Sequence, residues 1–236
     1  MCRTFMAWVF MALLRPGPVI DRIIRTDNME SASLIMCFGD SLTAGYQSPS
    51  RDNPTGRETP YGEFLGRLLG GRGSIAVSGI CGETTGEMVL RFRSDVLDRR
   101  PRYVIILGGT NDLGWNAAPQ DIMRNLVKMY ELARAAGIMP IPVTVPSVRV
   151  PAADEEESSR WVTSHIASRQ KLNGMIQDYA RSKDLPCLDL FTATADHVSL
   201  QLRSEYSNDG LHLTTEGYRR FAVLLHERIF SRLVIS

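Results

Sequence analysis

Short continuous apolar runs alternate along the chain with segments whose apolar residues recur every three or four positions. The runs end at turn-forming residues, which is the pattern of strands that are buried on both faces of a sheet. On this basis we predict strands at 34–38, 74–77, 103–107, 138–145 and 186–190.

The segments between these runs predict helices. One apolar stripe begins behind Pro119, can end at Gly137, and consists of Ile122, Leu126, Met129 and Ala133. A second stripe, between Tyr218 and Ile229, has charged residues on the opposite face and predicts a closing amphipathic helix. We predict a third helix over 158–182.

Strands that alternate with helices imply right-handed crossovers and a mainly parallel sheet. We therefore predict a three-layer α/β/α sandwich around a sheet of five strands, built from the five runs above. In such sheets ligands bind outside the carboxyl ends of the strands. The residues that follow each strand are therefore the candidates for chemistry.

The first strand is followed by Gly39-Asp40-Ser41-Leu42. A serine on a turn at the carboxyl edge of the sheet is placed for nucleophilic attack. A helix beginning there would direct its free amides towards negative charge that develops beside Ser41. Taken alone, the motif is also an ordinary strand-to-helix turn, because Ser and Asp are common helix caps.

The next two strands are also followed by glycine-rich, polar loops. Gly82 lies in the loop after the second strand and can bring a bare backbone N–H close to the same point. Asn111 lies in Gly-Gly-Thr-Asn-Asp after the third strand and can donate a side-chain amide proton. Both are candidate donors to an oxyanion.

Asp209 and His212 stand three residues apart before the last predicted helix. A carboxylate bonded to one imidazole nitrogen fixes the tautomer and leaves the other nitrogen to take a proton from serine. We interpret His165 and His226 as surface or half-buried helix residues. His197 directly follows Asp196, and adjacent helical positions project apart.

In these blocks the sequence resembles the SGNH hydrolases, also called GDSL esterases and lipases. The matching segments are 39–42, 82–85, 109–112 and 209–212, in the family's order. The resemblance implies a flavodoxin-like hydrolase fold and an acyl-enzyme mechanism without a cofactor. It also implies a triad of Ser41, His212 and Asp209, with the Ser41 amide, Gly82 and Asn111 forming the oxyanion hole.

Two other classes of function stay open. A metal-dependent phosphoesterase could use carboxylate, amide and imidazole ligands at the strand ends, namely Asp40, Asn111, Asp112, Asp209 and His212. A lipid- or carbohydrate-binding module could keep the fold without its chemistry. The complete set of triad residues favours the serine hydrolase.

The charge balance narrows the range of partners. Lys and Arg total 27 and Asp and Glu total 26, so the chain lacks the field that steers a polyanion to a protein. We therefore expect a small-molecule ester as partner and no nucleic acid. The sequence indicates no particular oligomeric state.

We expect residues 1–30 to be an N-terminal extension and residues 31–236 to be the hydrolase domain. The extension is compatible with a disordered segment or with a natural start at Met29. Its apolar stretch, 5–14, resembles a signal peptide but lacks a following cleavage site and is too short to span a bilayer. The cysteines form no CxxC pair, which favours a reducing compartment: Cys2, Cys37, Cys81 and Cys187. We therefore expect no integral membrane span and a cytoplasmic location, with secretion left open as the alternative by the apolar stretch.

Overall fold

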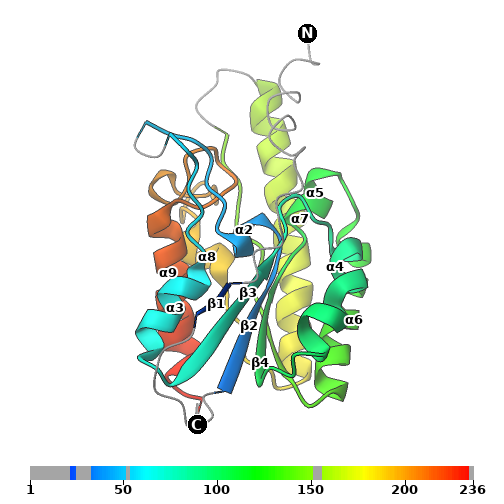
Figure 1. The fold of residues 1–236 in the computed structure, drawn as a ribbon. Coiled ribbons are helices and arrows are strands. Elements are labelled where there is room, and N and C mark those ends of the chain that lie inside the picture. The colour runs from blue at the N-terminus through cyan, green and yellow to red at the C-terminus, as the bar shows by residue number, and fades with distance from the viewer. Residues whose placement is uncertain (1–21, 25–32, 52–53, 151–155, 234–236) are drawn as a thin grey trace.

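The computed structural model describes residues 22–24, 33–51, 54–150 and 156–233. They form one five-stranded sheet with the strand order β1-β3-β2-β4-β5 (Figure 1). Its strands are β1 (Arg22–Ile24), β2 (Ser33–Gly39), β3 (Gly73–Gly79), β4 (Tyr103–Leu107) and β5 (Met139–Pro142). β2 to β5 pair in parallel, whereas β1 runs antiparallel to β3.

Helices cover both faces of the sheet (Figure 1). The longer ones are α3 (Tyr61–Leu69), α4 (Thr85–Phe92), α6 (Pro119–Ala135), α7 (Glu156–Ser182) and α9 (Thr215–Leu225). The short ones are α2 (Ser41–Ala44), α5 (Thr110–Gly114), α8 (Leu190–Thr194) and the 3₁₀ turn η3 (Ser204–Tyr206). α4 and α9 each continue into a π-helical turn, η2 (Arg93–Leu97) and η4 (His226–Phe230).

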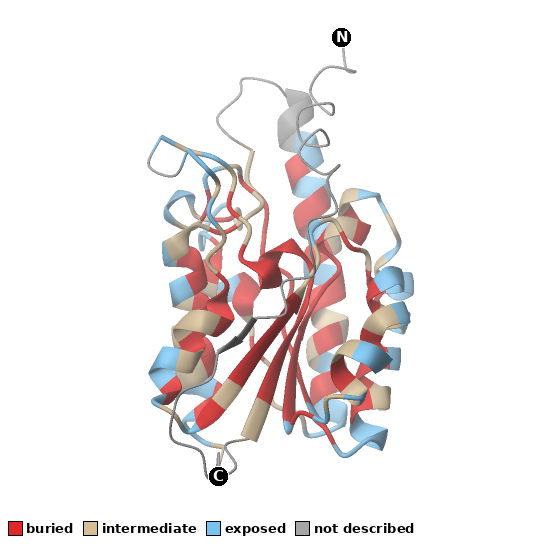
Figure 2. Cartoon of the chain, in the orientation of Figure 1, coloured by how far each residue is buried: buried red, intermediate tan, exposed pale blue. Residues whose placement is uncertain are grey.

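Two apolar cores lie on opposite faces of the sheet, because successive side chains of a strand point to opposite sides. Ile35 and Cys37 of β2 pack on the face covered by α3 and α9. Met36 and Phe38 pack on the face covered by α4, α6 and α7. Figure 2 shows the central strands mostly buried, whereas the outer faces of the helices are exposed. The predicted α/β/α sandwich is confirmed.

Most predicted elements are found close to their predicted bounds. Among the strands, 138–145 is found only as β5, which ends at Pro142, and in 186–190 a single bridge from Val143 to Leu188 replaces a strand. Pro186 lacks a backbone donor, and Asp189 already caps α8 by accepting from the Thr192 amide. The fifth strand is instead β1, which lies within the segment 1–30 that was expected to precede the domain.

Most of the predicted N-terminal extension, including its apolar stretch 5–14 and Cys2, lies outside the described residues. Among the residues that are described, no helix is both long enough and apolar enough to cross a membrane.

Candidate active site

The turns after β2, β3 and β4 meet at the carboxyl edge of the sheet, and two glycines allow this. A Cβ at Gly79 would lie 2.3 Å from the Ala44 nitrogen and 2.8 Å from the Asp40 carbonyl oxygen. A Cβ at Gly39 would lie 2.2 Å from the Leu107 carbonyl oxygen. Glycine is needed because any side chain would push the turns apart.

Ser41 is the first residue of α2 and is almost fully buried. Asp40 caps this helix, since its Oδ1 accepts a hydrogen bond of 2.9 Å from the Leu42 amide. Gly45, at φ 84°, ends the helix after one turn. The backbone therefore holds Ser41 at the carboxyl edge of the sheet, as the sequence predicted.

Ser41, His212 and Asp209 form one hydrogen-bonded chain. His212 Nε2 lies 3.2 Å from Ser41 Oγ, and His212 Nδ1 lies 2.8 Å from Asp209 Oδ2. The backbone amides of Leu211 and His212 each donate to Asp209 Oδ1 at 2.8 Å. Burial raises the pKa of the Asp209 carboxyl. The hydrogen bond and charge of His212, together with the hydrogen bonds from Ser48 and Leu211, lower this pKa by more than burial raises it. The net result is a pKa well below the usual range, so Asp209 stays ionised near neutral pH.

Two residues of the loop after α2 complete this arrangement and were not singled out from the sequence. The Ser48 hydroxyl donates to Asp209 Oδ2, and the Tyr46 ring meets the His212 imidazole edge-to-face with centroids 4.6 Å apart. The Tyr218 hydroxyl donates to the Tyr46 carbonyl at 2.6 Å and fixes the loop on α9. No local pattern could reveal Ser48, because 161 positions separate it from Asp209.

The two other predicted oxyanion donors lie on adjoining loops. Gly82 has a φ of 80°, and the Asn111 Nδ2 donates at 2.8 Å to the carbonyl of the next residue, Glu83. A primary amide has two N–H donors, so this bond leaves Asn111 a second one. The bond makes the position of Asn111 depend on the loop that carries Gly82.

The carboxylates of Asp40 and Asp112 accept hydrogen bonds from Leu42 and Thr85 respectively. Asp112 accepts from the Thr85 amide at 2.9 Å and the Thr85 hydroxyl at 2.6 Å, which fixes the start of α4 beside the third turn. Within the described part of the chain, no three His, Cys, Asp or Glu side chains are grouped so that they could hold a metal ion.

The remaining histidines lie apart from this chain of hydrogen bonds. His226 is half-buried near Arg72, as expected for a helix residue, and His197 is exposed. His165 is buried, contrary to the expectation of a surface or half-buried position, and it contacts Trp161 and Arg169 of the same helix. Burial and the Arg169 charge lower the pKa of His165 to about 4.

The fold is an α/β sandwich, and at its sheet edge a serine, a histidine and an aspartate form one hydrogen-bonded chain. The chain belongs to the GDSL-like lipase/acylhydrolase family, which it matches over residues 37–220. The family membership that the four sequence blocks predict is thus confirmed.

Individual proteins are similar to this chain in sequence or in fold. The chain is 36% identical over 116 residues to an uncharacterized lipoprotein of Bacillus subtilis strain 168, YqeF, and the match covers 47% of each chain. Two solved structures share 25% identity with a TM-score of 0.67. A GDSL-like lipase from Bacteroides thetaiotaomicron matches over 89% of this chain and 93% of its own, and a lipase/acylhydrolase from Enterococcus faecalis over 86% and 98%.

Proposed function

We propose that the protein is a serine esterase that cleaves carboxylic esters through an acyl-enzyme on Ser41. The observation that carries the proposal is the continuous hydrogen-bond chain from Ser41 Oγ through the His212 ring to Asp209. Membership of the GDSL-like lipase/acylhydrolase family supports the same chemistry.

In the proposed reaction, His212 Nε2 takes the proton of Ser41 while Oγ forms a bond to the ester carbonyl carbon. The ionised Asp209 stabilises the imidazolium that results. The imidazolium then gives its proton to the leaving alcohol, and the ester C–O bond breaks. A water molecule, deprotonated by the same histidine, hydrolyses the acyl-enzyme and frees Ser41. The cycle needs no cofactor.

We assign the oxyanion of the tetrahedral intermediate to three donors. They are the Ser41 amide, the Gly82 amide and the second side-chain N–H of Asn111. Ser41 begins α2, where backbone amides are free of helical partners, and Gly82 and Asn111 lie on adjoining loops joined through Glu83.

The proposal is tested with Ser41→Ala. We expect this variant to lose p-nitrophenyl acetate hydrolysis and fluorophosphonate labelling, while Ser182→Ala, which alters an exposed serine on α7, keeps both. Parent-level hydrolysis by Ser41→Ala would refute the mechanism. Activity that a chelator abolishes would favour a metal-dependent phosphoesterase, and ligand binding without labelling would favour a binding module.

We also propose that the enzyme acts in the cytoplasm. The support is that Cys37, Cys81 and Cys187 are free thiols, as expected in a reducing compartment. The lipoprotein name of the Bacillus subtilis relative points instead to the cell envelope, although that match covers 47% of each chain. Fractionation of cells that produce the full chain distinguishes the two locations.

A further inference from the structure

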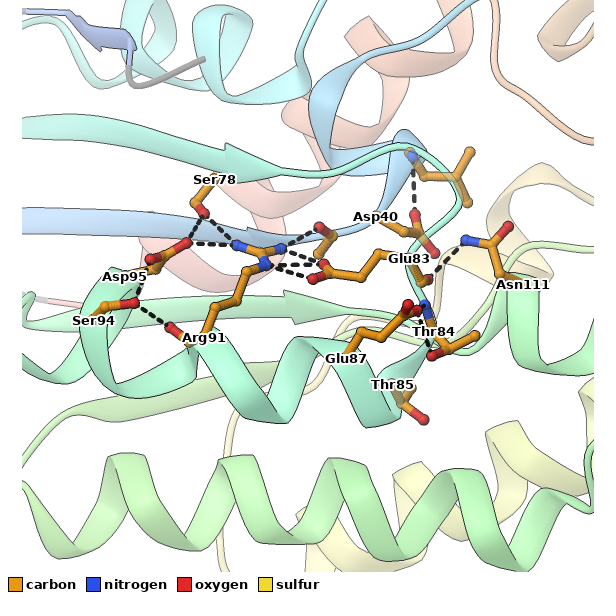
Figure 3. A network of polar contacts seen from close by, with 12 residues as sticks. Asp40, Ser78, Glu83, Thr84, Thr85, Glu87, Arg91, Ser94, Asp95 and Asn111 are labelled. Atoms are coloured by element: carbon orange, nitrogen blue, oxygen red, sulfur yellow. Dashed lines mark hydrogen bonds and ion pairs between the residues drawn. The ribbon is translucent and has the colours of Figure 1, made fainter. Parts of the chain in front are cut away.

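Arg91 lies in the last turn of α4, and only 13% of its side chain is exposed although the guanidinium is a charged group. Its guanidinium binds groups from four parts of the fold (Figure 3). Nε donates to both carboxylate oxygens of Glu83, at 2.7 and 2.9 Å, and Nη2 donates to the Gly39 carbonyl at 2.9 Å. Nη1 donates to the Ser78 hydroxyl and, at 2.8 Å, to Asp95.

Glu83 connects this guanidinium to the proposed oxyanion hole. Its amide follows Gly82 directly, and its carbonyl accepts the hydrogen bond from Asn111 Nδ2. A shift of Glu83 would therefore move two proposed donors, the Gly82 N–H and the Asn111 side chain. The Glu83 side chain is only 7% exposed, so the contact with Arg91 is shielded from water and salt.

The Gly39 carbonyl connects the same guanidinium to the nucleophile. Gly39 ends β2 two residues before Ser41, and its carbonyl also accepts from the Ile80 amide at 3.1 Å. The guanidinium carbon lies 4.2 Å from the centroid of the Phe38 ring, which in turn packs against Phe92. The planar, rigid guanidinium thus holds the end of β2, which precedes Ser41, at a fixed distance from the loop that carries Glu83.

A buried ion pair is weak grounds for assigning a stabilising role, because removing two charges from water costs about as much as their attraction returns. Oxyanion donors, in contrast, must be held within about 0.5 Å of their working positions. We infer that Arg91 is a positioning residue that holds Gly82 and Asn111 in place through Glu83, while fixing Gly39 beside them. The inference rests on the oxyanion hole of the proposed function.

The test compares Arg91→Met and Glu83→Gln with the parent. Methionine keeps the length of the side chain but no donor. In Glu83→Gln, the amide places an N–H group against the guanidinium donors, so the paired contact is lost while the backbone carbonyl remains. We expect kcat, per active site titrated with a fluorophosphonate, to fall at least about tenfold in both variants, less than the loss of a whole donor. KM for a short ester should stay within about twofold, because the donors act mainly in the transition state.

Asp95→Asn is the matched control. Asp95 pairs with the same guanidinium, but its other hydrogen bonds come from Ser78 at 2.9 Å and Ser94 at 2.7 Å rather than from the loop that carries Glu83. Asp95→Asn should lower the melting temperature while kcat stays within about twofold of the parent, because the hydrogen bonds from Arg91 Nε to Glu83 remain. In all three variants the pH profile of kcat/KM should keep its acidic limb, since His212 and Asp209 are untouched.

Each outcome decides between the two proposals. Parent-like kcat in folded Glu83→Gln would overturn the positioning role while leaving the serine mechanism intact. Activity that survives in Ser41→Ala would overturn the serine mechanism instead. If Arg91→Met fails to fold, Glu83→Gln decides alone. Equal losses of kcat in Glu83→Gln and Asp95→Asn would mean that the network is structural only, and would also overturn the inference.

Discussion

Asp209 draws its hydrogen bonds from two distant parts of the chain. His212 and Leu211 are its close neighbours in sequence, whereas Ser48 comes from the loop that follows α2. The Ser48 bond joins the nucleophile's own loop to the acid of the proposed triad. It also holds the carboxylate oxygen that orients the imidazole, so Ser48 is expected to affect catalysis although it cannot touch the scissile bond.

Ser48→Ala should lower kcat/KM by about tenfold, because a hydrogen bond to a charged group is worth roughly 1.5–3 kcal/mol. The lost bond also moves the pKa of Asp209 upwards, towards its usual range. Steady-state kinetics on a short ester measures the loss. The control is Ser199→Ala, which removes an equivalent Ser–Asp bond to Asp196 on an exposed loop. Equal kinetics in the two variants would remove Ser48 from the site.

The protonation of Asp40 makes the free energy of unfolding depend on pH. Burial raises its pKa from 3.8 to about 7, against opposing effects of the Leu42 amide and the His212 charge. An acid whose pKa is higher in the folded chain binds its proton more tightly there. Its stabilising contribution is therefore present at low pH and is lost as the pH rises from about 4 to about 7.

Asp40→Asn removes this pH-dependent contribution, and the variant should therefore gain stability relative to the parent as the pH rises. We expect a relative gain of more than about 1 kcal/mol between about pH 5 and pH 8, since one pKa unit corresponds to 1.36 kcal/mol. Urea unfolding of both proteins at the two pH values measures it. Asp209, whose pKa is lowered, changes the free energy of unfolding with pH in the opposite direction. Both proteins contain Asp209, so its effect cancels in the difference between them. A constant difference would show that Asp40 ionises normally.

At the scale of elements, the loop that carries Asp209 and His212 lies against the segment after β5. The Arg149 amide donates to the Gly210 carbonyl at 2.8 Å, and the Gly210 amide donates to the Ser207 hydroxyl at 2.9 Å. Gly210 has a φ of 82°, and a Cβ there would lie 1.9 Å from the Arg149 carbonyl oxygen. The two segments can approach this closely only with glycine.

Gly210→Ala should therefore displace the loop and lower both stability and kcat. The left-handed conformation alone costs a non-glycine residue about 1–3 kcal/mol, and the backbone contact adds to this. Gly137→Ala isolates the first part, because Gly137 has a φ of 75° at the end of α6 with no atom within 4 Å of its Cβ. Chemical denaturation and ester kinetics should show activity loss in Gly210→Ala alone. Equal activity in both would show that the loop tolerates the shift.

The elements also show how far the sequence predicts this protein. Continuous apolar runs identified β2, β3 and β4, because strands buried on both faces leave a strong hydrophobic signal. β1 escaped prediction because a short edge strand that pairs along one side needs no such run. The segment 186–190 has the run but not the strand, since Pro186 and Asp189 limit it to a single bridge.

The same contrast holds in the site. Ser41 could be proposed because a motif and a strand-end position coincide there, and Asp209 and His212 because an acid and an imidazole stand three residues apart before the last helix. Ser48 and Arg91 were not, because their roles depend on which loops the fold brings together. Glu83 lies within a recognised block, yet only the structure reveals that its carbonyl binds Asn111 and its carboxylate binds Arg91.

The whole molecule is expected to unfold as one unit, because the same strands contribute side chains to both apolar cores. Phe221 on α9 tests this expectation, since it is fully buried and packs on Tyr61 with ring centroids 4.0 Å apart. Phe221→Ala should cost about 3–5 kcal/mol, through lost burial and the cavity that remains. The loss occurs on the face covered by α3 and α9.

Two tryptophans report on helices other than α3 and α9. Trp115 directly follows α5, and Trp161 lies in α7. In a Trp8→Phe background, urea unfolding followed by tryptophan fluorescence should shift in Phe221→Ala as much as unfolding followed by far-ultraviolet circular dichroism. Coincident shifts mean that damage to one core destabilises the opposite layer in full, as in a single cooperative domain. A fluorescence transition that stays at the parent's urea concentration while the dichroism becomes biphasic would mean that the two layers unfold separately. In that case, the prediction of one hydrolase domain over 31–236 would be wrong.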